Sequence, residues 1–376
     1  MRKVKIIPAA TEPGTTKWWA RKWLKVGRPE TKAGIQKDWR PPTVLLSCLL
    51  FLASSPILAS AAPPPAANDL LQAALADPQV AYQGRVMLTQ WYGKRTRAEE
   101  ARVFFNPPNL YRWEFLSPDG QISRVIISDG SDEFVWLPKE HKVLKGSAAK
   151  SSPKLMVPEL ERELLLKNYQ AKLLGPDQVA GRTTWVLELA PLIPGKPHQK
   201  FWIDQETAVI LETKRLGPTG ARAGLSRFAR FKPQKDMSKD LFQVKADSMT
   251  QVIDHGLDPD FFSIKELRHR TGKSLNLPEQ LPGNFTFESG DAYQLNEASV
   301  RHIRYTDGLA VLSLFETSRP VGPMLDKTRE FSPLATPEQF SSGKVLQWKK
   351  GHQYFTLVGD VSDELLEQIA SELKAM

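Results

Sequence analysis

The chain has 376 residues, 41% of them hydrophobic and 25% charged, which is ordinary for globular protein and leaves room for about two domains. Its net charge of +9 would suit a nucleic-acid-binding protein, but residues 1–40 carry eleven Lys or Arg against three acidic residues. Only about one positive charge is left for everything after them, so we expect no nucleic-acid partner for the body of the chain.

A leader with the features of a secretory signal peptide opens the sequence. The uncharged stretch TVLLSCLLFLASSPILASA, residues 43–61, follows the basic segment and ends in Ala59-Ser60-Ala61, a small-x-small cleavage signature. We expect cleavage between Ala61 and Ala62 and a periplasmic or extracytoplasmic location. The basic segment of about 40 residues is longer than that of a usual signal peptide, which indicates either that translation starts further downstream or that the segment is an uncleaved N-terminal membrane anchor.

Two further details of the leader concern a basic segment and a cysteine. KWWARKWLK, residues 17–25, fits a nucleic-acid patch, a membrane-surface helix or discarded leader. Cys48 lies too early in the apolar run to be the cysteine of a lipid anchor. If the leader is removed, the remaining chain has no cysteine.

The residues after the leader predict a sheet-rich domain. A short helix is expected over 69–77, capped by Asn68, and a helix of about three turns over 159–169, with Pro158 in its first turn. Short runs rich in β-branched and aromatic residues, separated by Gly, Pro, Asn and Asp, predict an antiparallel meander. They are residues 82–92, 98–105, 110–116, 122–128, 133–137 and 141–145 before the second helix, and 169–175, 183–191, 199–204, 208–216 and 224–231 after it.

A second, smaller unit is expected toward the C-terminus. The pattern loosens from Lys232 to about Leu281, where FFSIKELRHRTGK predicts only a short helix. Residues 303–316 then predict a hairpin around Asp307-Gly308, and residues 345–360 predict another. Residues 361–373 predict a helix with a single apolar face. Two hairpins and a helix indicate a small α+β domain.

The sequence offers no convincing catalytic or metal site. Its six histidines stand singly, without the spacing of a zinc site, and no cysteine pairs with them. It has no nucleophile elbow, phosphate loop or dinucleotide fingerprint. We therefore expect a protein that is not an enzyme and that binds no cofactor or metal.

Large apolar side chains occur on both sides of the predicted strands. Tyr111, Trp113 and Phe115 share one side of their strand, because alternate residues of a strand point the same way. A strongly bent sheet would enclose such residues around an apolar pocket for lipid or hydrophobic peptide. A filled core with a few exposed aromatics is the alternative. The candidate pocket residues are Met87, Trp91, Phe104, Trp113, Phe115, Phe134, Trp136 and Trp185.

Several stretches resemble one known family. YQGRVMLTQWY, NLYRWEFLSPDG, VIISDGSDEFVWLP, VAGRTTWVLELAP and KFWIDQETAVILETK are similar to the N-terminal domain of the MucB/RseB family, which shares the fold of the LolA and LolB lipoprotein carriers. LPGNFTFESGD, YTDGLAVLSLFE and the closing hairpin and helix resemble the C-terminal domain of that family. The resemblance covers roughly residues 68–376, apart from the connector.

The resemblance implies an α+β fold in two parts. The first is a LolA-like, half-open antiparallel β-barrel of about eleven strands with a helical lid, and the second is a smaller C-terminal α+β domain. The expected boundaries are a signal peptide at 1–61, the N-terminal domain at 62–235, a connector at 236–280 and the C-terminal domain at 281–376.

The resemblance also implies a function and its partners. Members of the family bind the extracytoplasmic part of a membrane anti-sigma factor and slow its proteolysis, and lipid is thought to release them. The first hypothesis is thus a regulator of an envelope-stress sigma pathway that senses lipid or a lipoprotein acyl chain. The second is a LolA-like lipoprotein or lipid carrier, which would not need the second domain. Strand addition beside Asp307-Gly308 makes candidate partner-binding residues of Tyr305, Leu309, Val311 and Phe315.

Overall fold

The computed structural model describes residues 64–92, 95–148, 158–245, 248–254, 260–261, 263–271, 277–295, 298–320 and 344–376. The cleavage site expected at Ala61 and Ala62 lies outside these residues. Within the described ranges, no helix is both long and apolar enough to cross a membrane.

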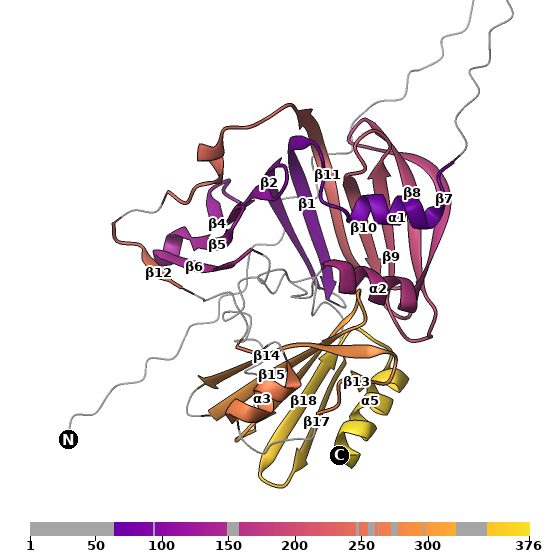
Figure 1. The fold of residues 1–376 in the computed structure, drawn as a ribbon, viewed down its shortest axis with the longest axis vertical. Coiled ribbons are helices and arrows are strands. Elements are labelled where there is room, and N and C mark those ends of the chain that lie inside the picture. The colour runs from indigo at the N-terminus through magenta and orange to yellow at the C-terminus, as the bar shows by residue number, and fades with distance from the viewer. Residues whose placement is uncertain are drawn as a thin grey trace, which may run out of the picture. The chain divides into compact units, whose positions relative to one another are not determined.

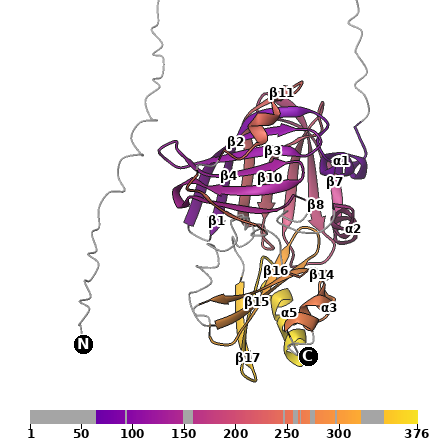
Figure 2. The same ribbon diagram turned by 60° about the vertical axis from the view of Figure 1, so that its left-hand side comes forward.

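The first part of the chain forms a curled sheet of twelve strands, seen from two sides in Figures 1 and 2. Two antiparallel meanders, β1 to β6 and β7 to β11, join where β1 pairs with β11, and only β12 pairs in parallel, with β6. The strands are β1 (Ala81–Tyr92), β2 (Arg95–Asn106), β3 (Leu110–Leu116), β4 (Ile122–Asp129), β5 (Asp132–Leu137), β6 (Lys142–Ser147), β7 (Tyr169–Val179), β8 (Arg182–Pro191), β9 (His198–Asp204), β10 (Ile210–Leu216), β11 (Arg222–Gln234) and β12 (Gln251–Ile253). The expected half-open antiparallel barrel is confirmed.

Tight turns set the register of this sheet. Between β3 and β4, the amide of Gly120 donates to the carbonyl of Ser117 at 2.8 Å, and Gly120 has a φ of +81°. Glycine reaches that conformation without a steric penalty. The turn therefore places Trp113 directly opposite Ile126 on the neighbouring strand.

Two helices cover one end of the curled sheet. Leu70 and Leu71 of α1 (Ala67–Leu75) and Leu165 of α2 (Pro158–Asn168) pack on residues of β8 and β9 in one buried cluster. These helices form the expected lid, over β7 to β9. Asn68 does not cap α1 as expected, because the helix already begins at Ala67.

The second part of the chain is a six-stranded sheet with two helices on one face. Its order is β13-β14-β15-β16-β18-β17, and every neighbouring pair is antiparallel. Helices α3 and α5 pack on it through Ile264, Leu267, Leu366 and Ile369. The elements are α3 (Ile264–Thr271), β13 (Gln280–Leu281), β14 (Phe285–Leu295), β15 (Ala298–Thr306), β16 (Val311–Thr317), β17 (Lys344–Lys350), β18 (Gln353–Gly359) and α5 (Asp363–Ala375).

The residues between the two sheets contribute to both of them. β12 extends the first sheet, whereas α3 packs on the second. The short 3-10 helix η2 (Lys239–Phe242) also lies against the first sheet, since Arg112 of β3 donates to the carbonyl of Leu241 at 3.4 Å. Another 3-10 turn, η1 (Pro138–Glu140), links β5 to β6.

The pairing of β1 with β11 depends on a glycine. A Cβ atom on Gly84 would lie 2.6 Å from the ring of Phe228 and closer still to the carbonyl oxygen of Arg230. Gly224, on β11, offers a matched position, because a Cβ there would meet no atom nearer than 3.8 Å.

We therefore expect Gly84→Ala to lower the free energy of unfolding by about 1–3 kcal/mol, the usual cost of overpacking. Gly224→Ala should cause no loss. Urea unfolding of both variants measures the difference, and equal stability of the two would contradict the close packing at Gly84.

Candidate functional site

A cavity of about 490 Å³ opens on the concave face of the first sheet. That volume lies in the range typical of sites for small molecules. The lining comes from eight strands, β1 to β5 and β9 to β11. The lining residues are Leu88, Gln90, Arg97, Glu99, Tyr111, Trp113, Phe115, Arg124, Ile126, Glu133, Gln199, Thr213, Arg215, Gly224, Leu225 and Ser226.

The apolar part of the lining is built around two stacked aromatic rings. Trp113 and Phe115 lie on the same side of β3, with their ring centroids 6.2 Å apart and the rings nearly parallel. Leu88, Ile126 and Leu225 add aliphatic surface. This surface suits a hydrocarbon chain, because burial of apolar area is what stabilises such a complex.

The polar part of the lining is charged. The guanidinium of Arg124 lies 3.8 Å above the ring of Phe115 and 3.2 Å from the carboxylate of Glu99, which also pairs with Arg97. Burial lowers the pKa of Arg124, and Glu99 opposes that shift. The Tyr111 hydroxyl donates to Glu133, and burial followed by the charge of Glu133 raises the Tyr111 pKa far above its usual value. The cavity therefore combines an apolar wall with polar groups able to orient a headgroup.

The eight residues predicted to line a pocket divide between the two faces of the sheet. Trp113 and Phe115 line the cavity, and Trp185 packs on the cluster beneath the lid. The other five alternate with residues of the concave face along strands of regular register, so they point to the opposite, convex face. These are Met87, Trp91, Phe104, Phe134 and Trp136.

The convex face carries many ion pairs between strands. Arg102 of β2 lies 2.8 Å from Glu114 of β3, and Arg85 of β1 pairs with Glu100 of β2. Met87, on the same face, is 39% exposed. Phe134 and Trp136, farther along the same face, lie opposite the buried side chains of Ile127, Val125 and Val143.

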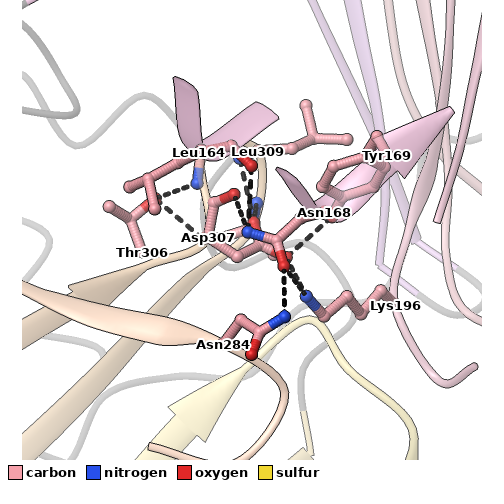
Figure 3. A network of polar contacts seen from close by, with 10 residues as sticks. Leu164, Asn168, Tyr169, Lys196, Asn284, Thr306, Asp307 and Leu309 are labelled. Atoms are coloured by element: carbon pink, nitrogen blue, oxygen red, sulfur yellow. Dashed lines mark hydrogen bonds and ion pairs between the residues drawn. The ribbon is translucent and has the colours of Figure 1, made fainter. Parts of the chain in front are cut away.

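A buried polar network joins the first sheet to the second (Figure 3). Lys196, between β8 and β9, lies with its Nζ 2.9 Å from Oδ2 of Asp307, in the turn between β15 and β16. Both side chains have no exposed surface. Tyr169, the first residue of β7, donates its hydroxyl to the same oxygen at 2.9 Å. Burial, and then the charge of Asp307, raises the pKa of Tyr169 well above its usual value.

Two asparagines complete this network. Asn168 donates through Nδ2 to the carbonyls of Asp307 at 3.0 Å and Leu164 at 2.9 Å. Its Oδ1 accepts from Lys196 at 3.1 Å and from Nδ2 of Asn284 at 3.2 Å. We call the set Asn168, Tyr169, Lys196, Asn284 and Asp307 the joint.

The predicted partner-binding residues lie inside the protein. Tyr305, Leu309, Val311 and Phe315 are all buried. Leu309 packs into the cluster beneath the lid of the first sheet, and the hydroxyl of Tyr305 donates to the carbonyl of Pro278 at 3.0 Å. Whether any of the four contacts a partner stays a prediction.

The prediction of a free strand edge beside Asp307-Gly308 is wrong. β15 pairs with β14 and β16, and β16 pairs with β15 and β18, so neither strand has an edge open to an added strand. The Asp307 turn is itself closed, since its Oδ1 accepts from the amides of Leu309 and Ala310. A hairpin motif in the sequence predicts the turn, but it does not predict which other strands pair with the two strands of the hairpin.

Metal binding finds no support in the described part of the chain, where no three acidic, histidine or cysteine side chains converge.

A curled sheet covered at one end by two helices, followed by a smaller sheet with its own helices, is also the fold of MucB. The family model for the MucB/RseB N-terminal domain matches residues 66–246. This stretch is therefore a MucB/RseB N-terminal domain, and the resemblance to that family is confirmed.

Solved structures resemble the chain in fold. MucB in complex with MucA(peri) matches at a TM-score of 0.54 and 18% identity, over 81% of this chain and 97% of that one. The MucA/MucB complex of Pseudomonas aeruginosa matches at 0.54 and 18%, over 81% and 96%. A LolA superfamily protein from Nitrosomonas europaea matches at only 0.25 and 12%, over 48% and 99%, which is too low to support an argument. No protein with a curated description matches the chain.

The joint yields a prediction about stability. Lys196→Ala would leave the carboxylate of Asp307 buried without its cation, and breaking a buried pair in this way costs about 3–5 kcal/mol. Lys200→Ala is the control, because Lys200 pairs with Glu188 at a partly exposed position, where such pairs contribute at most about 1 kcal/mol. Urea unfolding compares the two variants, and equal losses would show that the joint does not hold the sheets together.

Proposed function

We propose that this protein is an extracytoplasmic regulator of an envelope-stress sigma-factor pathway and that it binds an anti-sigma factor. The main support is that the match to MucB in the MucB–MucA(peri) complex extends over 81% of this chain, which is more than its first sheet. The MucB/RseB N-terminal domain at residues 66–246 supports the same role. A role in binding agrees with a sequence that has no catalytic motif.

The proposed location follows from the leader and from the family. Residues 43–61 have the features of a signal peptide, and the similar MucB structure is a complex with MucA(peri), which supports a partner outside the cytoplasm. A partner there would meet the two sheets as one body, because the joint and Leu309 connect them. A simple carrier has no need of that connection.

We further propose that the cavity binds a long-chain amphiphile, such as a lipid or a lipoprotein acyl chain. Its stacked rings and aliphatic wall suit the chain, and the arginines of the lining offer polar contacts for a headgroup. The same cavity supports the alternative function, a LolA-like lipoprotein or lipid carrier of the cell envelope.

The regulatory function predicts retention of an anti-sigma factor. The full chain, immobilised, should retain an extracytoplasmic fragment of the anti-sigma factor from the same organism, and a scrambled fragment should pass through. If the partner contacts both sheets, Lys196→Ala should retain less than the control Lys200→Ala, because only the first variant loosens the joint. A calorimetric titration gives the affinities.

Failure to retain the fragment, with amphiphile binding intact, would contradict the regulatory function and favour the carrier. Equal retention by the two lysine variants would instead confine the partner to one sheet.

Amphiphile binding is tested through chain length and two tryptophans. Each added methylene should contribute about 0.8 kcal/mol, close to fourfold in affinity. The ligand-induced change in fluorescence should be lost in Trp113→Phe, because Trp113 lines the cavity. It should persist in Trp136→Phe, because Trp136 points to the convex face. An affinity that does not depend on chain length would contradict the proposed cavity ligand.

A further inference from the structure

One arginine belongs both to the wall of the cavity and to the contact between the sheets. Arg215, near the end of β10, is among the residues that line the cavity. Its Nη2 lies 3.1 Å from Oδ2 of Asp360, which directly follows β18 of the second sheet. The side chain of Arg215 is 13% exposed and that of Asp360 only 2%. A charge pair so deeply buried is costly to separate.

The turn that carries Asp360 packs on the loop that carries Lys196. Ser362, the N-cap of α5, donates its amide to the carbonyl of Gly195 at 2.7 Å. A Cβ atom on Gly195 would come within 2.6 Å of the Ser362 hydroxyl oxygen, so these two backbones approach closely. Gly195 directly precedes Lys196 of the joint. A shift of the turn that carries Asp360 would therefore also move the backbone beside Lys196.

The charges of the cavity leave Arg215 as the cation best placed to respond to a ligand. The lining holds three arginines and two glutamates. Arg97 and Arg124 both pair with Glu99, within the first sheet. The acidic partner of Arg215 belongs to the second sheet. An anion that enters the cavity and binds Arg215 thus competes with a contact between the sheets.

Building on the proposed function, we propose that Arg215 couples the cavity to the second sheet. An anionic amphiphile binds with its headgroup on Arg215, draws the guanidinium from Asp360 and so loosens the contact between the two sheets. Because coupling between two sites is reciprocal, the Arg215–Asp360 contact must in turn weaken the binding of that amphiphile. An uncharged amphiphile of the same length does not compete with Asp360 for Arg215.

The test uses tetradecanoate and the uncharged tetradecanol as ligands of the full chain, measured by calorimetric titration. Asp360→Asn removes the competing carboxylate with little change of shape. We expect it to bind tetradecanoate about fivefold more tightly or better, a usual size for such coupling, and tetradecanol with unchanged affinity. The matched control is Glu288→Gln, because Glu288 is similarly buried and lies 3.2 Å from Arg304 within the second sheet. It should bind both ligands like the wild type.

A second arm reports on the sheets themselves. Spin labels on Lys172→Cys in β7 and Lys349→Cys in β17, both exposed positions, measure the distance between the sheets in a chain whose single cysteine is removed by Cys48→Ser. Tetradecanoate should broaden this distance distribution in the wild-type background. In the Arg215→Gln background, which lacks the guanidinium, tetradecanoate should leave the distance distribution unchanged.

Three outcomes would overturn the proposal. Equal affinity of wild type and Asp360→Asn for tetradecanoate would overturn the coupling and leave the proposed cavity ligand standing. If Asp360→Asn raises the affinity for tetradecanol as much as that for tetradecanoate, the charge of the headgroup does not cause the coupling. Binding of neither ligand to any variant would overturn both the coupling and the amphiphile site, without touching retention of the anti-sigma fragment.

Discussion

The arrangement of this protein depends on one buried ion pair, between Lys196 of the first sheet and Asp307 of the second. Both side chains are fully buried, and a charge in such a place is tolerated only if it is paired and hydrogen-bonded. Asn168 and Tyr169 supply those hydrogen bonds from the end of α2 and the start of β7. Because the pair cannot separate without leaving charges in a dry interior, it fixes where the second sheet attaches to the first.

The curvature of the first sheet explains how one set of strands provides both a cavity and a charged surface. Side chains that alternate along β1 to β4 face the cavity or the convex side in turn. On the concave side they stack, as Trp113 and Phe115 do, and on the convex side they pair across strands, as Arg102 and Glu114 do. The lid covers the concave face over β7 to β9, whereas the cavity is lined by β1 to β5 and β9 to β11. Arg215 lies where that cavity meets the second sheet.

Much of the fold follows from the sequence, because strands and tight turns are local. The Pro-Asp-Gly turn at Gly120, the hairpin around Asp307 and the amphipathic helix after Ser362 all form where their residue patterns predict them. The sites are harder to predict, because alternation separates two faces without saying which one is concave. The sequence pattern therefore puts Trp113 and Phe115 in one set with Phe134 and Trp136, although the two pairs point to opposite faces.

The joint could hardly be predicted from the sequence. Lys196 stands in the segment Pro194-Gly195-Lys196-Pro197, which has the composition of an exposed loop, and lysine is seldom fully buried. Asp307 has an evident local role in its hairpin turn, so nothing indicated a distant partner. A pair so far apart along the chain becomes visible only when the two sheets are placed in space. For the same reason, the sequence does not show that β15 and β16 are interior strands with no open edge.

The most direct test of this account is native-state hydrogen exchange of backbone amides in β9 and β16, in the wild type and in Lys196→Ala. If the buried pair unites the two sheets, the amides of both strands in the wild type open with one common free energy. In the variant, β16 should open at a lower free energy than β9, because the second sheet has lost its buried attachment. Strands that already open separately in the wild type, or that keep a common free energy in the variant, would contradict the central role of Lys196 and Asp307.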